Sequence, residues 1–334
     1  MKTKHIYLII CAFITFSFVR CSEGIFDFNQ EQYKKTVYIM SNNTMIYDRM
    51  TADMDKPEDT LYVTVGVGGT QAITEDIAFS IELADSLINA YNKSNFDIDT
   101  ASYAKFLPLD NYTLPSLNGT IKKGENTAVI PVYLKHLDNL SPDSVYFLDF
   151  KIAHIDKFEI NLNKKESLFR IHWRNKWSNT KNLPVYSVIA QKWTENKIWS
   201  TPLNDSIYQS NNDTSKISAS PRIYPLTRNK VRVAAGSEKS GTLEEINSNS
   251  LILEITENND VVIKPYKSIR VEQINGNLEF PNRYIDEKIV TPGGQSTYYK
   301  TFMLHYRYKT NPTGNKWIRL QERLRLQYNP LSDK

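Results

Sequence analysis

Residues 301–328, TFMLHYRYKTNPTGNKWIRLQERLRLQY, decide the fold class of this chain. In both arms of the stretch, apolar side chains alternate with polar ones, which is the period of a strand with one buried face. Residues 311–315 (NPTGN), between the arms, have the composition of a turn. The stretch therefore predicts a long β-hairpin. Its apolar faces consist of Phe302, Leu304, Tyr306 and Tyr308 in the first arm and Ile318, Leu320, Leu324 and Leu326 in the second.

One acidic residue and two histidines raise separate questions about these strands. Glu322 falls on the apolar face of the second arm, where it either pairs with an inward-facing group or marks a bulge that shifts the register. His305 lies on the opposite face of the first arm, and His172 lies in another alternating segment. We expect both histidines to be surface imidazoles.

Alternating segments recur through the rest of the chain. In the first half, only residues 85–92 are predicted to be helical, with Asp85 at the N-cap. The short strands around them predict an immunoglobulin-like β-sandwich over residues 33–175. Residues 176–334 are predicted to form an antiparallel meander, closed into a calycin-like barrel or half-barrel. The chain is thus expected to be all-β. The predicted strands cover residues 61–67, 77–83, 127–134, 145–155, 185–193, 230–234, 250–256, 261–265 and 269–273.

The first 20 residues have the pattern of an export signal. Lys2 and Lys4 precede an apolar run over residues 6–19, which is shorter than the roughly 20 residues that span a bilayer. Cys21 follows, and it is the single cysteine left once the signal is removed. We therefore predict a lipoprotein signal peptide over residues 1–20, lipidation of Cys21 and a tether over residues 21–32. The alternative is a secreted protein with an incidental cysteine.

Length and charge limit the classes of function. The 334 residues are 40% hydrophobic and 12% aromatic, which suffices for two domains with separate cores. The formal net charge of +4 includes three cations of the signal, so the exported chain is almost neutral. It lacks a basic cluster, and we therefore expect no nucleic-acid partner.

Residues 61–134 resemble a known domain family. The segments that carry the resemblance are Val65–Thr70 (VGVGGT), Tyr112–Pro115 (YTLP) and Ile121–Glu125 (IKKGE). They are similar to the N-terminal sandwich domain of Bacteroidota surface lipoproteins, which also precedes endo-β-N-acetylglucosaminidase catalytic domains. The second half more loosely resembles the β-rich C-terminal domain of non-enzymatic members. The resemblance implies an outer-membrane lipoprotein of a starch-utilisation-type glycan locus, facing the cell exterior.

Candidate catalytic groups do not form a recognisable constellation. The histidines lack metal-ligand spacing, and no G-x-S-x-G elbow occurs. Asp143 and the pairs Glu244–Glu245 and Asp286–Glu287 are candidate acids for glycoside hydrolysis by residue type alone. The roughly 150 residues after the first domain are fewer than the ~250 of a β/α barrel. We therefore expect a protein that is not an enzyme and needs no cofactor or metal.

Aromatic side chains are the better candidates for a binding site. Sugars present flat C–H faces that stack on exposed aromatic rings, while polar neighbours bind the hydroxyls. We therefore predict a glycan platform that draws on Trp193, Trp199, Tyr298, Tyr299 and Trp317.

Three functions remain open on this evidence. The leading hypothesis is a non-catalytic cell-surface lipoprotein that binds a glycan or oligosaccharide for a polysaccharide-utilisation transport system. Its other partners are then the outer-membrane lipid, through Cys21, and a neighbouring transporter complex. A second possibility is a structural or assembly partner of that complex that binds no glycan. A third is a barrel that holds a small apolar ligand, against which the charge of Glu322 argues.

Overall fold

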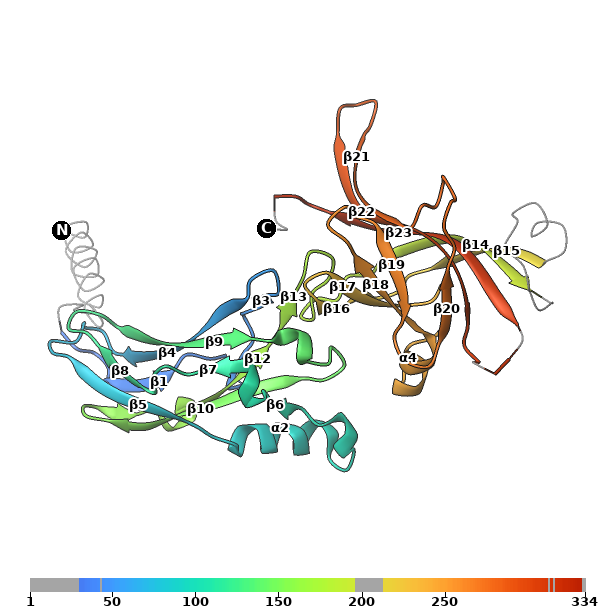
Figure 1. The fold of residues 1–334 in the computed structure, drawn as a ribbon. Helices are drawn as coiled ribbons and strands as arrows, with labels where there is room; N and C mark the ends of the chain where they lie inside the picture. Colours follow the sequence, from blue (N-terminus) through green and yellow to red (C-terminus); the bar gives the residue numbers. More distant parts are fainter. Residues whose placement is uncertain (1–29, 43, 196–212, 312, 315, 332–334) are drawn as a thin grey trace, which may run out of the picture.

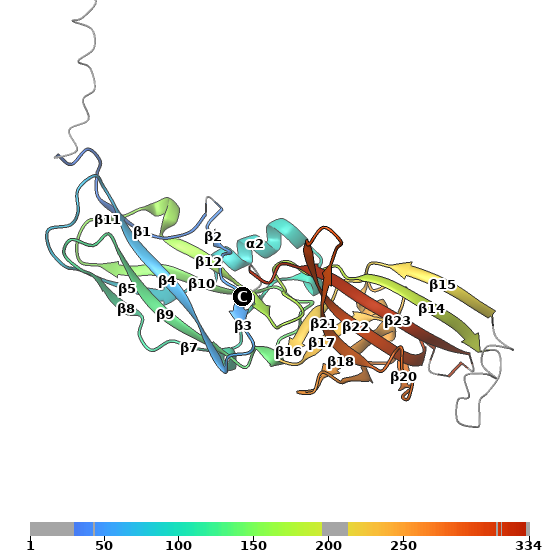
Figure 2. The same ribbon diagram turned by 90° about the horizontal axis from the view of Figure 1, so that it is seen from above.

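A computed structural model places residues 30–42, 44–195, 213–311, 313–314 and 316–331 of this chain. Two β-rich domains follow one another, and the predicted all-β class is confirmed (Figures 1 and 2). Cys21, the predicted signal peptide and most of the predicted tether lie outside the described residues. Within the described ranges, no helix is both long enough and apolar enough to cross a membrane.

The first domain is a sandwich of two sheets. One has the strand order β11-β1-β4-β9-β7, and the other has the order β2-β12-β10-β5-β8 with β6 beside β10. A small parallel sheet of β3 and β13 extends toward the second domain. The strands are β1 (Thr36–Ile39), β2 (Ile46–Tyr47), β3 (Ala52–Asp53), β4 (Glu58–Gly68), β5 (Ile77–Leu83), β6 (Lys105–Phe106), β7 (Tyr112–Thr113), β8 (Asn118–Ile121), β9 (Thr127–Lys135), β10 (Tyr146–Ile155), β11 (Glu159–Ile160), β12 (Glu166–Ile171) and β13 (Trp173–Arg174).

The period of two in the sequence builds the core of this sandwich. Leu61, Val63 and Val65 of β4 point inward and are almost fully buried. One glycine makes room for a ring within the second sheet, because the ring of Phe79 in β5 lies across Gly119, its register partner in β8. A Cβ at Gly119 would be 2.3 Å from that ring, so no larger residue fits there without movement.

The predicted first helix is confirmed and runs further than expected. Helix α2 (Ser86–Phe96) covers the outer side of the second sheet. Asp85 stands at the N-cap but makes no side-chain capping bond. The buried Asp149 of β10 takes this role, because its carboxylate accepts a hydrogen bond of 3.1 Å from the backbone N–H of Leu87. Burial and the neighbouring Glu166 raise the pKa of Asp149 to about 7.

The second domain also contains two sheets. The larger has the order β15-β14-β23-β22-β20, with β21 also paired to β22, and it curls into a half-barrel. The smaller is a meander in chain order, β16-β17-β18-β19. The first strand of the domain, β14, pairs with its last, β23. The strands are β14 (Ser187–Glu195), β15 (Asp213–Ala219), β16 (Tyr224–Thr227), β17 (Lys230–Ala234), β18 (Ser250–Ile255), β19 (Val261–Pro265), β20 (Arg270–Gln273), β21 (Arg283–Val290), β22 (Ser296–Lys309) and β23 (Trp317–Tyr328).

The predicted hairpin forms the centre of the larger sheet. Strands β22 and β23 pair without a register shift, and Leu304 lies opposite Glu322. Glu322 therefore pairs with an inward-facing group and does not mark a bulge. It is buried, and its Oε1 accepts a 2.7 Å hydrogen bond from the Tyr306 hydroxyl. Burial raises the pKa of Glu322 to about 7.

The expectation that His172 and His305 are surface imidazoles is wrong. Both side chains are buried. The Nε2 of His172 lies 2.7 Å from Asp48, whereas the Nε2 of His305 accepts a 2.7 Å hydrogen bond from Arg319 Nε. Long neighbouring side chains cover the face on which His305 lies, and strand alternation alone cannot predict this coverage.

A second helix was missed by the sequence analysis. Helix α4 (Leu243–Asn249) begins with a capping box, in which Thr242 and Glu245 each bind the other's backbone N–H. The spacing of these two residues is the usual signal for a helix start. The acidic pair Glu244–Glu245 therefore lies in the first turn of a helix, where negative charge is favourable. Four short 3₁₀ turns complete the elements, at Thr100–Ser102, Leu109–Asn111, Leu137–Asn139 and Leu162–Lys164.

A buried ion pair joins the two domains. Arg232 of β17 contacts the carboxylate of Asp143, from the first domain, through both of its terminal nitrogens, one at 2.6 Å. The Arg232 side chain is only 2% exposed. The rings of Tyr224 and Tyr266 lie 4.4 and 4.9 Å from its guanidinium carbon. Asp143 is thereby engaged in the joint between the domains.

We predict that Glu322 makes the stability of the second domain fall as pH rises. Its pKa is about 7 in the folded chain, against an ordinary pKa of 4.5 for a glutamate, so between these values the folded state holds a proton that the unfolded state has lost. The free energy of unfolding should therefore decrease over this window, by about 3 kcal/mol for the full shift. Urea unfolding between pH 4.5 and 8 should show a smaller decrease in Glu322→Gln, whereas the exposed Glu257→Gln should behave like the wild type. Equal slopes for wild type and Glu322→Gln would contradict the prediction.

We also predict that Asp143→Asn destabilises the chain strongly. The substitution leaves the buried Arg232 without its counter-charge, which typically costs about 3 kcal/mol or more. Asp138→Asn, at an exposed position of the same region, is the matched control. Chemical denaturation measures both variants, and a change below 1 kcal/mol in Asp143→Asn would show that the pair contributes little (a threshold of roughly the value of an exposed ion pair).

Candidate functional site

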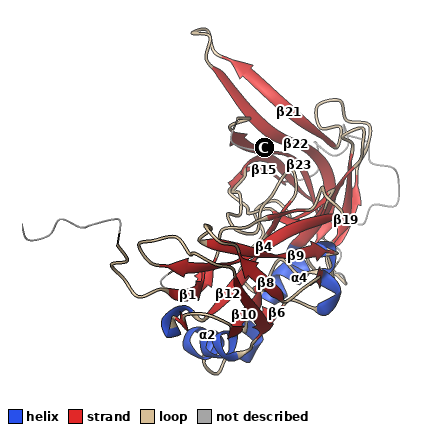
Figure 3. Cartoon of the chain, turned by 90° about the vertical axis from the view of Figure 1, so that its left-hand side faces the viewer, coloured by secondary structure: helices blue, strands red, loops and turns tan. Residues whose placement is uncertain are grey.

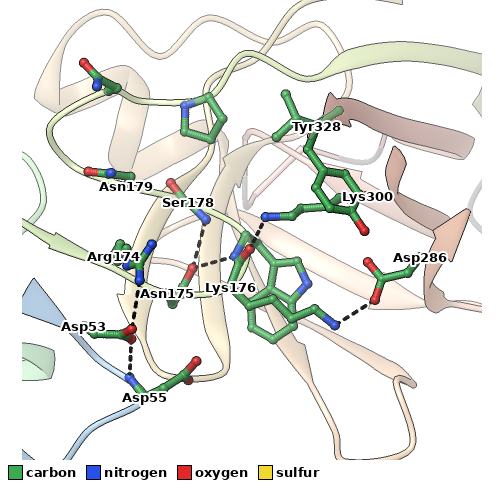
Figure 4. A pocket seen from close by; sticks show the side chains of 14 residues that line it. Asp53, Asp55, Arg174, Asn175, Lys176, Ser178, Asn179, Asp286, Lys300 and Tyr328 are labelled. Carbon is green, nitrogen blue, oxygen red and sulfur yellow. Dashed lines mark hydrogen bonds and ion pairs between the residues drawn. The ribbon is translucent and has the colours of Figure 1, made fainter. Parts of the chain in front are cut away.

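A cavity of about 500 Å³ lies where the two domains meet (Figure 4). We call it the interdomain pocket. One wall comes from β3 and β13, the floor from the loop over residues 175–184, and the other wall from β21, β22 and the end of β23. Its volume falls within the range of pockets that bind small ligands.

The wall from the first domain carries an oriented carboxylate. Arg174 and Asp53 lie opposite each other in the parallel pair of β13 and β3. Arg174 Nη2 donates to Asp53 Oδ2 at 3.2 Å, and the backbone N–H of Asp55 donates to Asp53 Oδ1 at 3.0 Å. These bonds hold the Asp53 carboxylate in place at the edge of the pocket (Figure 4).

The amide of Asn175 organises the floor. Its Oδ1 accepts hydrogen bonds of 3.1 and 3.0 Å from the backbone N–H groups of Trp177 and Ser178. Its Nδ2 donates to the carbonyls of Thr227 and Lys230 in the second domain. Trp177 is thereby fixed in the lining, with its ring packed edge-on against Tyr284 at 5.6 Å. The indole Nε1 is buried and has no hydrogen-bond partner among the described residues.

The wall from the second domain presents alternating charges. Asp286 accepts a 2.8 Å bond from Lys176 Nζ and a further bond from the Tyr284 hydroxyl. Lys300 Nζ donates to the carbonyl of Lys176 at 2.6 Å. Burial, followed by the hydrogen bond to Asp286, raises the pKa of Tyr284. The Tyr284 phenol therefore stays protonated and donates to the carboxylate at all physiological pH values.

Two tyrosines stand at the rim. Tyr328 lines the pocket, and Lys300 Nζ lies 5.0 Å from its ring centroid. Tyr298 packs edge-on against Tyr328 at 6.2 Å, with Lys288 Nζ over its ring at 5.8 Å. Both tyrosines also line an adjoining hollow beside the end of β23. Of the predicted site residues that the structure describes, Tyr298 is therefore the one that lies next to the pocket.

The chemistry of the interdomain pocket suits a hydroxyl-rich ligand. Its lining combines three carboxylates, three cations, side-chain amides and two aromatic residues. Carboxylates and amides accept or donate hydrogen bonds to hydroxyls, and rings contact C–H faces. No group of three or more His, Cys, Asp or Glu side chains suited to a metal ion occurs within the described residues.

The structure corrects the expected exposure of Trp193. This residue lies in β14 opposite Arg319 of β23, and it is only 6% exposed. The Arg319 guanidinium lies 5.0 Å from its ring centroid. Trp193 therefore offers no free ring face to a sugar, because neighbouring strands and long side chains cover it. Trp199 lies outside the described residues.

Tyr299 and Trp317 lie on the outer face of the half-barrel, away from Tyr298. Arg325 lies 4.5 Å from the Tyr299 ring, and Arg307 and Lys309 lie 4.5 and 4.7 Å from the ring of Trp317. Both aromatic side chains are half-buried. The predicted residues thus do not form one cluster, because consecutive residues of a strand point to opposite faces.

The remaining candidate acids have structural partners. Glu287 binds Arg325 and accepts a 2.9 Å hydrogen bond from Thr301. Asp286 binds Lys176 and Tyr284, and Glu245 belongs to a helix cap. Each of these three carboxylates therefore has a structural partner within the fold.

Sequence reasoning did not single out Trp177, Lys300 or Tyr328 as site residues. Lys300 and Tyr328 fall at ordinary positions of alternating strands, where no local signal separates a pocket residue from a surface one. Trp177 lies in a polar segment at the predicted domain boundary. Ligand sites often lie at boundaries between domains, so the position of Trp177 at the predicted boundary was the one sequence feature that pointed to this site.

Comparison with known proteins gives matches to both domains. A family model for an N-terminal domain matches residues 33–159, and a model for the corresponding C-terminal part matches residues 165–325. No curated protein matches the chain. The expected link to endo-β-N-acetylglucosaminidases stays a prediction.

Solved structures share the complete two-domain fold. Two of them are proteins of unknown function from Bacteroides ovatus. The first is 13% identical, with a TM-score of 0.61, and the match covers 87% of this chain and 94% of that protein. The second is 14% identical, with a TM-score of 0.57, and the match covers 87% of this chain and 91% of that protein. An auxiliary nutrient binding protein from Bacteroides thetaiotaomicron is 10% identical, with a TM-score of 0.53, over 81% of this chain and 83% of that one. Each domain of this chain is therefore similar to a known domain family, and solved Bacteroides proteins share the two-domain fold.

Proposed function

We propose that this chain is a non-catalytic glycan-binding protein of a polysaccharide-utilisation system. The observation that carries the proposal is the interdomain pocket, in which the Tyr328 ring at the rim accompanies oriented carboxylates, cations and amides. Such a lining complements a ligand with many hydroxyls and apolar C–H faces. The auxiliary nutrient binding protein of the same fold supports a role in nutrient uptake.

The partners of the carboxylates support binding rather than hydrolysis. A glycosidase needs one protonated and one free carboxyl group on the two sides of a scissile bond. Asp53 and Asp286 instead form ion pairs with Arg174 and Lys176. These residues suit the role of fixed hydrogen-bond acceptors for sugar hydroxyls.

The location of the protein follows from its N-terminal sequence in this proposal. Lipidation of Cys21 after removal of residues 1–20 anchors the chain in the outer membrane, facing the exterior. Residues 21–32 then act as a spacer. The bound glycan passes to a neighbouring outer-membrane transporter complex.

A role as an assembly partner without glycan binding is the second candidate. Exposed apolar side chains on the β21–β22 hairpin favour it, because such side chains can dock on another protein. Ile285, Ile289 and Val290 are 38%, 41% and 57% exposed. This hairpin projects from the body of the second domain (Figures 1 and 3).

We predict that Tyr328→Ala weakens glycan binding about tenfold, because it removes the ring at the rim of the pocket. A glycan array probed with residues 22–334, which include both cores, identifies the ligand, and titration calorimetry measures its affinity. Tyr299→Ala, on the opposite face of β22, is the matched control and should bind like the wild type. Loss of binding in Tyr299→Ala alone would move the site to the outer face of the half-barrel. The absence of any array signal would favour the assembly role.

We predict that Cys21→Ala abolishes lipid attachment, because the thiol is the group that receives the diacylglycerol. Labelling of cells with radioactive palmitate should mark the wild-type protein and not the variant. Protease treatment of intact cells should degrade the wild-type protein if it faces the exterior. Palmitate incorporation that persists in Cys21→Ala would refute the anchor.

A further inference from the structure

The central part of the outer face of the β1-β4-β9 sheet in the first domain carries no charged side chain between the Glu58–Lys135 pair at one end and Glu159, beside Thr36, at the other. Strand alternation places Thr60, Tyr62, Thr64 and Gly66 of β4 on this face, because Leu61, Val63 and Val65 enter the core. From β9 come Thr127, Val129, Pro131 and Tyr133, and from β1 come Thr36 and Tyr38. We call these ten residues the tyrosine face. A long uncharged face is unusual in a chain with 23% charged residues.

The tyrosine face is flat and accessible. Tyr62 and Val129 are 52% and 53% exposed. Tyr62 lies opposite Pro131, and Thr60 lies opposite Tyr133, so these residues occupy adjacent rows of the sheet. From Thr60 to Gly66 the face extends over about 20 Å, at the usual rise of a strand. It therefore offers an elongated plate rather than a pit.

Glycine allows a third ring to lie on this plate. Gly66 is the register partner of Tyr38, and a Cβ built at Gly66 would lie 3.0 Å from the ring carbon Cζ of Tyr38. The Tyr38 ring thus lies across the backbone of β4 instead of standing away from the sheet. Lys164 Nζ is 5.9 Å from the ring centroid of Tyr38 and marks the far end of the plate.

The tyrosine hydroxyls of this face are available to a ligand. Those of Tyr38, Tyr62 and Tyr133 make no hydrogen bond to another described residue, and each can donate and accept. Threonine hydroxyls add further donors and acceptors between the rings. Between its charged ends, where Lys135 and Lys164 lie, the plate offers a ligand rings and hydroxyls.

The plate leads toward the interdomain pocket. Its near end is the cross-strand pair Glu58–Lys135, and Lys135 lines a hollow that extends to Asp53. Asp53 also belongs to the wall of the interdomain pocket. In Figure 1 the layer with β4 and β9 is the upper layer of the first domain, and the β21–β22 hairpin rises on the same side. The hollow thus shares Lys135 with the end of the plate and Asp53 with the wall of the interdomain pocket.

We propose that the tyrosine face is a second glycan subsite, which binds the extension of a neutral polysaccharide whose end or branch occupies the interdomain pocket. This inference rests on the proposed function and specifies its substrate class. Neutral chains fit because a charged chain loses hydration here without gaining a counter-charge. The length of the plate and its spaced rings match a ribbon of successive sugar rings.

The test compares long and short ligands of one backbone. Affinity electrophoresis of residues 22–334 through native gels that contain xyloglucan, galactomannan, arabinan, dextran or the acidic polygalacturonate measures polymer binding. We expect retardation in at least one neutral gel and none in polygalacturonate. Tyr62→Ala and Tyr133→Ala should weaken binding to the neutral polymer about tenfold each. Calorimetry with a trisaccharide of the same backbone should give wild-type affinity in both variants, because the trisaccharide fills only the pocket.

Controls separate the failure of this inference from that of the proposed function. Phe106→Ala, an exposed aromatic residue on the other sheet, should leave polymer binding unchanged, and thermal unfolding checks that each variant is folded. Normal polymer binding by Tyr62→Ala and Tyr133→Ala, with loss in Tyr328→Ala, overturns the tyrosine face alone. Retardation in polygalacturonate only overturns the neutral class. Self-association that Tyr62→Ala abolishes makes the face a protein interface. No retardation in any gel and no array signal count against the proposed function itself.

Discussion

The guanidinium of Arg232, buried against Asp143 and between two tyrosine rings, sets the relation of the two domains. A charge withdrawn from water is tolerable only when its partner is held in place, so the two sides of the joint cannot separate freely. The amide bonds of Asn175 to Thr227 and Lys230 reinforce the same arrangement. The interdomain pocket depends on this joint, because residues of both domains line it.

Cations lie over the aromatic rings on the outer face of the half-barrel. Trp193, Tyr299 and Trp317 each have at least one cation over the ring, supplied by Arg319, Arg325 and Arg307. A ring used in this way stabilises the sheet surface and has one face less to offer a sugar. Among the described residues, Tyr62 of β4 and Tyr133 of β9 have no such cation over their rings, whereas Tyr38 of β1 has Lys164 Nζ 5.9 Å from its ring centroid. The rings of Tyr62 and Tyr133 are therefore the basis of the proposed second subsite.

Two buried carboxylates show how far alternation can predict a site. The position of Glu322 on the inner face followed from the period of β23, but its partner, Tyr306 on β22, depends on the register of the hairpin. Asp149 likewise sits on a predicted strand, yet its role at the start of α2 depends on how that helix packs. The buried His172 and His305 lie on faces that were expected to be exposed, because coverage by long side chains is not a periodic property.

The sequence by itself determined the all-β class and the central hairpin with its inward face. These features depend on local alternation and turn composition, which act between residues close in the chain. The tertiary structure alone decided the interdomain pocket, since Asp53, Trp177, Asp286 and Tyr328 come from segments far apart in the chain. It also decided which aromatic residues are accessible, because exposure depends on side chains from neighbouring strands whose pairing no local pattern encodes.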